Sequence, residues 1–273
     1  MPELTWIAFP LLGVIAGVLA GLLGIGGGIV LVAALVALLP LFGVPGEAVM
    51  HVALATSLAS IIVTASASAN AHRQRGSVLW PSVRWLAPGL VVGGVAGSLW
   101  AANVPGETLT MLVGGFCLLM AARMAWPSRA ATDARNDEAP QGLWLGAAGI
   151  CIGAVSAVVG IGGGSLTVPL LVSRGVATVR AVGTSSACGV VIALASAATY
   201  ALAPRWVESA AAATAMPAGV VGFVHWPAAL GIGAGAWFAA PYGVRLAHRL
   251  SGVALARVFA VALASVGVAL LWP

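Results

Sequence analysis

Charge is scarce in this chain of 273 residues, and lysine is missing altogether. Charged residues make up only 7% of it, where a soluble domain carries about 25%. All twelve basic residues are arginines, and no acidic residue falls inside a clearly apolar stretch. These shortages exclude a soluble globular protein, a disordered chain and a nucleic-acid-binding protein.

Motifs and residue clusters that support enzyme chemistry are also missing. There is no P-loop, HExxH or GxSxG motif, no metal-ligand cluster, and no pair of carboxylates within the apolar stretches. The three cysteines, Cys117, Cys151 and Cys188, lie in separate apolar segments, so we expect buried thiols rather than disulfides or ligands. We therefore expect no enzyme activity, no cofactor and no metal site; in particular an ATPase, an intramembrane protease and a membrane assembly factor are disfavoured.

Hydrophobic residues are abundant instead. They form 61% of the chain, with 36 glycines besides, and the mean hydropathy is +1.07. Apolar segments are bounded by charges, prolines and turn residues, and the one strongly polar stretch is 128–141. The sequence predicts an all-α integral membrane protein with a first transmembrane repeat at 1–127, a polar linker at 128–142 and a second repeat at 143–273.

The two predicted repeats share several short motifs in the same order. The run GIGGG occurs at 24–28 and again at 160–164; we call these the first and second glycine tips. Thr56-Ser57 recurs as Thr184-Ser185, and Trp80-Pro81 recurs as Trp226-Pro227. Internal duplication of this kind is common in secondary transporters. The stretch 204–225 has no counterpart in the first half, and we expect a long, partly interfacial loop there.

The first apolar segment of each half allows two topologies. Residues 6–42 are too many for one ordinary span of about 20 residues, and the first glycine tip interrupts them. If each first segment crosses the membrane, the arginines divide seven against five between the two sides. If each turns back as a Gly-broken hairpin, eleven arginines share one side and only Arg205 lies on the other. The positive-inside rule favours the second case, with inverted four-segment halves, a cytoplasmic linker and both termini outside.

The glycine tips are the best candidates for a ligand site. Adjacent glycines leave backbone N–H groups unshielded, and a helix that starts after them has a partly positive N-terminus that suits an anion. Hydroxyls on the second apolar segment of each half would add hydrogen bonds without a fixed charge. The candidate substrate-binding residues are Gly26, Gly27, Gly28, Gly162, Gly163, Gly164, Ser165, Thr56, Ser57, Thr184 and Ser185. The alternatives are tight helix packing for the glycines and helix–helix hydrogen bonds for the hydroxyls.

Other small and polar residues fit structural roles. We assign the remaining glycine ridges to helix packing; they are Gly13/Gly17/Gly21, Gly89/Gly93/Gly97, Gly149/Gly153 and Gly231/Gly235. We expect His72, His225 and His248 in loops or at the interface. His51 lies near a predicted membrane end, where a structural role competes with one in a proton relay.

Together these motifs resemble the TauE/SafE sulfite-exporter family, which includes 4-toluene sulfonate uptake permease-type transporters. The resemblance rests on the duplicated GIGGG, on Pro169-Leu170-Leu171 after the second copy, on 180–185, on 216–229 (MPAGVVGFVHWPAA) and on 243–259. The first copy departs from the pattern because Leu31-Val32-Ala33-Ala34 has no such proline. The resemblance covers nearly the whole chain and specifies the family better than the substrate.

The resemblance implies a multi-pass secondary transporter of the bacterial inner membrane. Its substrate would be a small sulfur-containing anion, sulfite or an organosulfonate such as sulfoacetate, moved by alternating access and exported, with a proton or sodium ion as the coupling ion. The alternatives are a passive small-anion channel and a carrier of a non-sulfur metabolite. Its partners would be this small anionic substrate and the lipid bilayer, with no nucleic acid; the sequence does not define the oligomeric state.

Overall fold

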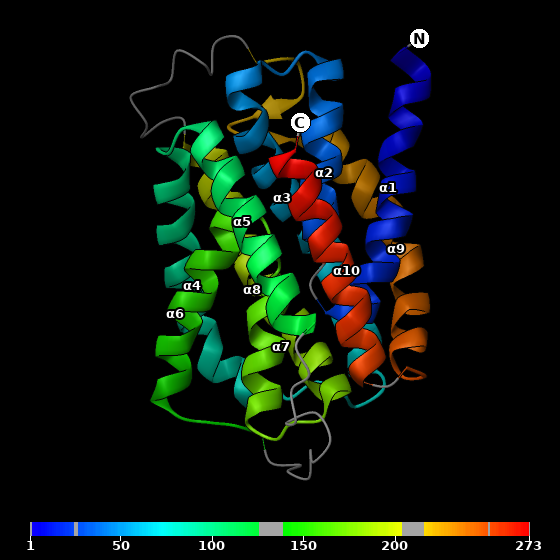
Figure 1. Ribbon diagram of the computed structural model, residues 1–273, viewed down its shortest axis with the longest axis vertical. Helices are drawn as coiled ribbons and strands as arrows, with labels where there is room; N and C mark the ends of the chain where they lie inside the picture. Colours follow the sequence, from blue (N-terminus) through cyan, green and yellow to red (C-terminus); the bar gives the residue numbers. More distant parts are fainter. Residues whose placement is uncertain (1, 25–26, 126–138, 204–215, 251, 273) are drawn as a thin grey trace.

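The computed structural model describes residues 2–24, 27–125, 139–203, 216–250 and 252–272, and these are almost wholly helical (Figure 1). The elements in chain order are α1 (Pro2–Leu23), α2 (Gly28–Leu38), the 3-10 helix η1 (Leu39–Phe42), α3 (Gly46–Arg73), α4 (Trp80–Ala102), α5 (Gly106–Ala125), α6 (Leu143–Val159), α7 (Gly164–Ser173), α8 (Thr178–Leu202), β1 (Val220–Val221), β2 (Val224–His225), α9 (Trp226–Ala247) and α10 (Gly252–Leu271). Residues 128–138 of the polar linker, like 204–215, lie outside the described residues.

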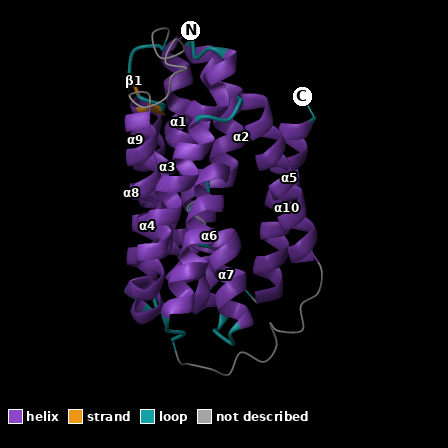
Figure 2. Cartoon of the chain, turned by 90° about the vertical axis from the view of Figure 1, so that its left-hand side faces the viewer, coloured by secondary structure: helices purple, strands orange, loops and turns teal. Residues whose placement is uncertain are grey.

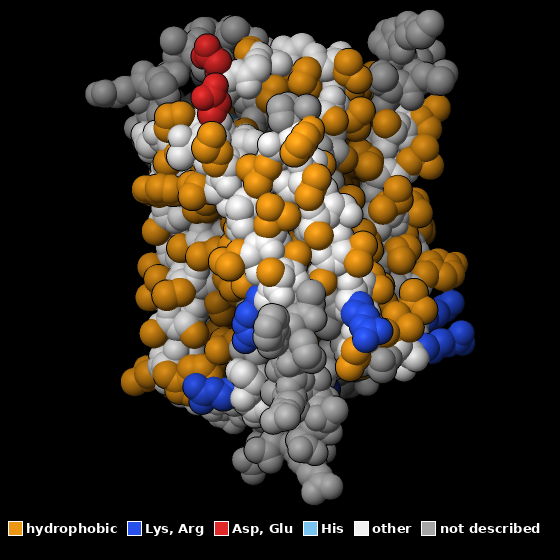
Figure 3. Space-filling model, viewed as in Figure 1, with side chains coloured by type: hydrophobic (Ala, Val, Ile, Leu, Met, Phe, Trp, Pro, Cys, Tyr) orange, Lys and Arg blue, Asp and Glu red, His pale blue; other side chains and the backbone are white. Residues whose placement is uncertain are grey.

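The helices form an elongated bundle with the polarity of a membrane protein. Among the described residues, five helices are long and apolar enough to cross a bilayer, namely α1, α3, α4, α5 and α8. On the face shown in Figure 3, hydrophobic side chains cover the middle of the molecule, arginines gather at one end and acidic side chains at the other. The predicted all-α, multi-pass membrane architecture is confirmed.

Glycine ridges bring two helix pairs into close contact. Along α4, a β-carbon added at Gly93 would overlap the carbonyl oxygen of Ile150 on α6. Along α1, a β-carbon at Gly13 would overlap the carbonyl oxygen of Ile232 on α9. The predicted packing role of these ridges is confirmed, since only a residue without a side chain fits such backbone approaches.

The long helices α3 and α8 lie at the centre of the bundle. They pack on each other, α9 packs on α3, and α4 packs on α8. A further pair, α5 and α10, lies on one side (Figure 2). Because the close pairs α1/α9, α4/α6 and α5/α10 each join one predicted half to the other, the two halves are interleaved.

Two expectations need correction or completion. Cys151 is exposed on the surface of α6, whereas Cys117 and Cys188 are buried as expected. A cysteine in an apolar helix can face lipid as well as protein, and composition alone does not separate the two. Of the stretch expected to be a long loop, the described part carries the short antiparallel pair β1/β2, in which Val220 pairs with His225.

Candidate functional site

Each glycine tip is the turning point of a hairpin. The ring of Trp6, near the start of α1, lies 5.1 Å from the ring of Phe42, at the end of η1. In the second half, the Arg174 guanidinium at the end of α7 lies 4.0 Å over the ring of Trp144, near the start of α6. Both segments, α1–η1 and α6–α7, therefore return to the end of the molecule at which they start, as expected for a hairpin rather than a crossing.

The lengths of the returning helices place both tips deep in the molecule. At 1.5 Å per residue, α2 and α7, with 11 and 10 residues, are about 16 Å and 15 Å long, half of a hydrocarbon core of about 30 Å. The two returning helices come from opposite ends of the bundle (Figure 1). They meet at the tips, because a β-carbon at Gly28 would lie 2.5 Å from the carbonyl oxygen of Gly160.

The two tips share an unusual backbone conformation. Gly27 and Gly163, which precede α2 and α7, have φ of +72° and +80°, in the left-handed region that glycine adopts without strain. Neither helix has a side-chain cap at its N-terminus. The first amides of both helices therefore lack a side-chain cap. Gly26 lies outside the described residues.

Each tip accepts a hydrogen bond from a serine of the other half of the chain. The Ser57 hydroxyl on α3 lies 3.0 Å from the carbonyl oxygen of Gly160 and 3.1 Å from that of Gly28. The Ser185 hydroxyl on α8 donates to the carbonyl oxygen of Gly24 at 3.0 Å. Each serine thus accounts for a carbonyl that the tip leaves outside helical hydrogen bonding, and both are fully buried.

The two threonines of the candidate set hold the starts of α4 and α9. The Thr56 hydroxyl accepts from the backbone N–H of His225, just before α9, at 2.9 Å. The Thr184 hydroxyl accepts from the backbone N–H of Leu79, just before α4, at the same distance of 2.9 Å. The predicted hydroxyls therefore surround the tips, and all four are engaged with backbone groups in this conformation.

Unpartnered hydroxyls gather around the second tip. Among the described residues, four buried side-chain atoms have no hydrogen-bond partner, and they belong to His72, Ser98, Ser156 and Thr167. Ser156 lies one helical turn before the second tip, and Thr167 lies one turn after the start of α7. A β-carbon at Gly163 would lie 3.5 Å from the Thr167 hydroxyl oxygen. Buried polar groups normally have partners, so these two hydroxyls are candidate ligand contacts beside the second tip.

The first tip lacks these hydroxyls. At the spacing that relates the two glycine runs, Ser156, Ser165 and Thr167 correspond to Ala20, Ile29 and Leu31. Sequence reasoning included Ser165, which is buried, and missed the other two. The signal that would have found them is this residue-by-residue comparison of the two copies.

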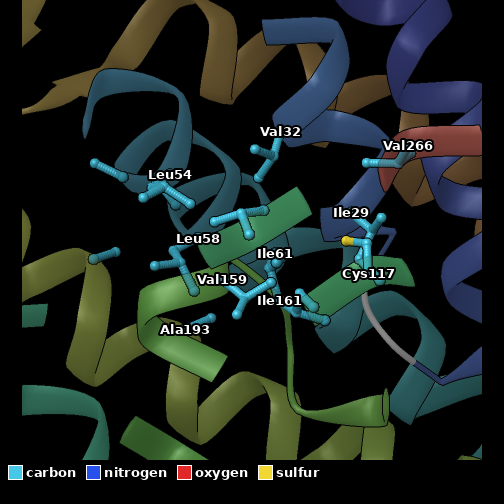
Figure 4. Close-up of a cluster of buried hydrophobic side chains, with 14 of the residues drawn as sticks. Ile29, Val32, Leu54, Leu58, Ile61, Cys117, Val159, Ile161, Ala193 and Val266 are labelled. Carbon is cyan, nitrogen blue, oxygen red and sulfur yellow. The ribbon is translucent and has the colours of Figure 1, made fainter. Parts of the chain in front are cut away.

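Apolar side chains enclose the meeting point of the tips. Ile29 and Ile161 extend from the tips, and Leu58 and Ile61 of α3 pack around them (Figure 4). The cavity beside the first tip, lined by Gly27, Ile29 and residues of α1 and α10, has a volume of about 10 Å³. Since one water needs about 10–15 Å³, this cavity has no room for an anion of several atoms in this conformation.

Two histidines expected in loops or at the interface are buried instead. His72 is fully buried, and its Nε2 lies 3.1 Å from the carbonyl oxygen of Gly21. His225 lies among the rings of Trp6, Phe9 and Phe42, with centroids 6.0–6.3 Å away. Its Nδ1 accepts from the N–H of Ala228, and burial lowers its pKa below the ordinary 6.5.

Comparison with known proteins identifies the family. The profile described as "Sulfite exporter TauE/SafE" matches residues 9–270. The chain belongs to the TauE/SafE sulfite exporter family. It is 33% identical over 258 residues to a "Probable membrane transporter protein" of Haemophilus influenzae, covering 94% of this chain and 95% of that protein. A "Probable membrane transporter protein" of Xylella fastidiosa is 32% identical over 176 residues, covering 63% of this chain and 65% of the relative. No solved structure matches this chain.

Membership confirms the family expected from the glycine motifs and identifies a membrane transporter. In this TauE/SafE chain the glycine motif precedes α2 and α7. The repeated Thr-Ser lies on α3 and α8, and the repeated Trp-Pro begins α4 and α9.

Proposed function

We propose that this protein is a secondary transporter of small sulfur-containing anions, sulfite or an organosulfonate such as sulfoacetate, in the bacterial inner membrane. The single observation that carries the proposal is the second glycine tip with its unpartnered hydroxyls. Free amides of a helix N-terminus and uncharged hydroxyl donors, in an apolar enclosure, suit a compact oxyanion. The family description supports sulfite as the substrate and export as the direction.

The anion would bind in contact with the second tip. The amides of Gly163, Gly164 and Ser165 would face the charged oxygens, and the hydroxyls of Ser156 and Thr167 would donate to them. The first tip, at Gly27 and Gly28, would form the wall of the binding site opposite the second tip. Gly26 and Gly162 would contribute further backbone amides to the site. Ser57 and Ser185 would fix the tip carbonyls, and Thr56 and Thr184 the adjoining helix starts.

Inverted halves would give this site alternating access. The hairpins enter from opposite ends, the serine bonds are reciprocal between halves, and so are the threonine bonds. The close pairs α1/α9 and α4/α6 also exchange when the halves are exchanged. A two-fold relation in the membrane plane accounts for all of these features. Movement of one half against the other would admit the anion from either side, coupled to a proton or sodium ion.

Counterflow in proteoliposomes tests the proposal. Vesicles loaded with unlabelled sulfite should accumulate external radiolabelled sulfite transiently and saturably, which a carrier does and a passive channel does not. Sulfoacetate should compete, and acetate should not. The Thr167→Val variant should lose uptake while Thr199→Val, the same change on a hydroxyl that bonds only its own helix, should keep it. Equal uptake by both variants would place the site elsewhere.

A further inference from the structure

A polar cavity opens at the arginine-rich end of the molecule, away from the glycine tips. It lies between the end of α3 and the end of α9 and has a volume of about 330 Å³. Arg75 and Arg245 line it from the two sides, together with the amide side chains of Asn70 and Gln74. None of its lining residues is acidic, so two guanidinium groups share one cavity without a carboxylate from the cavity wall.

The polar side chains that line this cavity suit an oxyanion. A guanidinium offers paired N–H donors that match phosphate geometry, and side-chain amides add neutral donors. Two neighbouring positive charges repel each other unless an anion lies between them or water screens them. A cavity of this size has room for a phosphate group and part of the molecule that carries it.

The apolar part of the cavity indicates which kind of anion fits. Trp237 and Pro241 continue the lining along α9 from Arg245 toward the middle of the bundle. Trp237 lies eight residues before Arg245, a rise of about 12 Å along the helix, and it is half exposed on the surface. A ligand that fills the whole cavity therefore needs an anionic head at the arginines and an apolar portion beside Trp237.

The cavity is not a by-product of the duplicated architecture. The matching positions of α8 and α4 carry no charged side chain. At the spacings set by Ser57/Ser185 and Trp80/Trp226, Asn70, Gln74 and Arg75 correspond to Ala198, Leu202 and Ala203, and Trp237 and Arg245 to Val91 and Leu99. The polar residues are therefore confined to the end of the molecule that carries the arginines.

We propose that the cavity between α3 and α9 binds the headgroup phosphate of an anionic phospholipid from the arginine-rich leaflet. Arg75 and Arg245 hold the phosphate oxygens, Asn70 and Gln74 bond the headgroup, and the lipid glycerol and upper acyl chain lie along Pro241 and Trp237. Anionic lipids are concentrated in the cytoplasmic leaflet, and basic pockets between helices on that side are suited to their headgroups. The site is separate from the substrate site at the second tip.

Thermal stabilisation of the detergent-purified protein by phosphatidylglycerol tests the proposal. Phosphatidylcholine with the same acyl chains controls for the apolar part, and inorganic phosphate at matched ionic strength controls for the charge alone. We expect phosphatidylglycerol to raise the unfolding midpoint saturably and the two controls to leave it unchanged. Equal stabilisation by phosphatidylcholine would overturn the proposal, and stabilisation by inorganic phosphate would reassign the cavity to a soluble anion.

Variants of matched charge complete the test. Arg75→Gln/Arg245→Gln should weaken phosphatidylglycerol binding about tenfold, which corresponds to about 1.4 kcal/mol for the two arginines together. The control Arg84→Gln/Arg123→Gln removes two exposed arginines from the same end and should bind like the wild type. Equal binding by both double variants contradicts the proposal. If the first double variant does not fold, Trp237→Leu, which leaves the charges intact, must weaken phosphatidylglycerol binding in its place.

Discussion

At the scale of single residues, hydroxyls divide into those with partners and those without. Ser57 and Ser185 bond tip carbonyls across the two halves, whereas the hydroxyls of Ser156 and Thr167 are buried without a partner. A buried hydroxyl that is bonded stabilises the fold, and one that is not costs stability until a ligand or water satisfies it. The same side-chain chemistry thus serves the scaffold at one place and the proposed substrate at another.

Removal of the bonded hydroxyls should destabilise the protein. Ser57→Ala leaves the carbonyls of Gly28 and Gly160 without this donor, and we expect a loss of about 1–3 kcal/mol, seen as a lower unfolding midpoint in detergent. Ser60→Ala is the matched control, because the Ser60 hydroxyl bonds only the Thr56 carbonyl of its own helix. An equal midpoint for the two variants would show that the cross-half bond contributes nothing.

Protonation of His225 should weaken the fold at mildly acidic pH. Since burial lowers its folded-state pKa, the unfolded chain takes up the proton first as pH falls below 6.5. Stability from the neutral ring is thus complete above pH 6.5 and is lost as pH falls toward the folded-state pKa, where the Nδ1 acceptor for Ala228 disappears. His225→Asn keeps a capping acceptor without titration, so its unfolding midpoint should fall less with pH than that of the wild type. If the unfolding midpoints of His225→Asn and the wild type fall equally with pH, His225 does not cause the loss of stability.

At the scale of elements, glycines set how closely the helices approach. The pairs α1/α9 and α4/α6 meet backbone to backbone, which is possible only where side chains are absent. Gly93→Ala should lower the unfolding midpoint through an overpacking cost of about 1–3 kcal/mol, because its β-carbon would overlap the Ile150 carbonyl. Gly115→Ala on α5 meets no atom within 4 Å and should be neutral or mildly stabilising. A neutral Gly93→Ala would mean that these helices separate easily.

Much of this element-level architecture was predictable from the sequence. The glycine runs, the arginine positions and the repeated motifs together indicated a helical membrane protein whose first segments turn back at their glycines. The burial of His72 was not predictable, because α3 continues through Arg73, beyond the end of the apolar segment from which the helix was predicted. Ser156 and Thr167 were missed because a single hydroxyl within an apolar run looks like an ordinary helix residue until its partners are known.

At the scale of the whole molecule, charge sets the orientation. Gln74 follows the end of α3 and Arg249 follows the end of α9, at the arginine-rich end, whereas Glu107 lies at the start of α5, at the opposite end (Figure 1). The positive-inside rule places the arginine-rich end in the cytoplasm. In a variant without native cysteines, Glu107→Cys should react with a membrane-impermeant maleimide in intact cells. Gln74→Cys and Arg249→Cys should react only after the cells are permeabilised. Labelling of Gln74→Cys and Arg249→Cys from opposite sides would mean parallel halves instead.

The measurement that tests the central claim most directly is sulfite binding to the purified protein, followed by isothermal titration at matched ionic strength, for the wild type and Thr167→Val. The account predicts saturable binding that Thr167→Val weakens by about tenfold or more, because a hydrogen bond to a charged group contributes about 1.5–3 kcal/mol. The unfolding midpoint without ligand should not fall, because the lost hydroxyl had no partner. Unchanged sulfite affinity in a folded Thr167→Val protein would contradict the assignment of the anion site to the second tip.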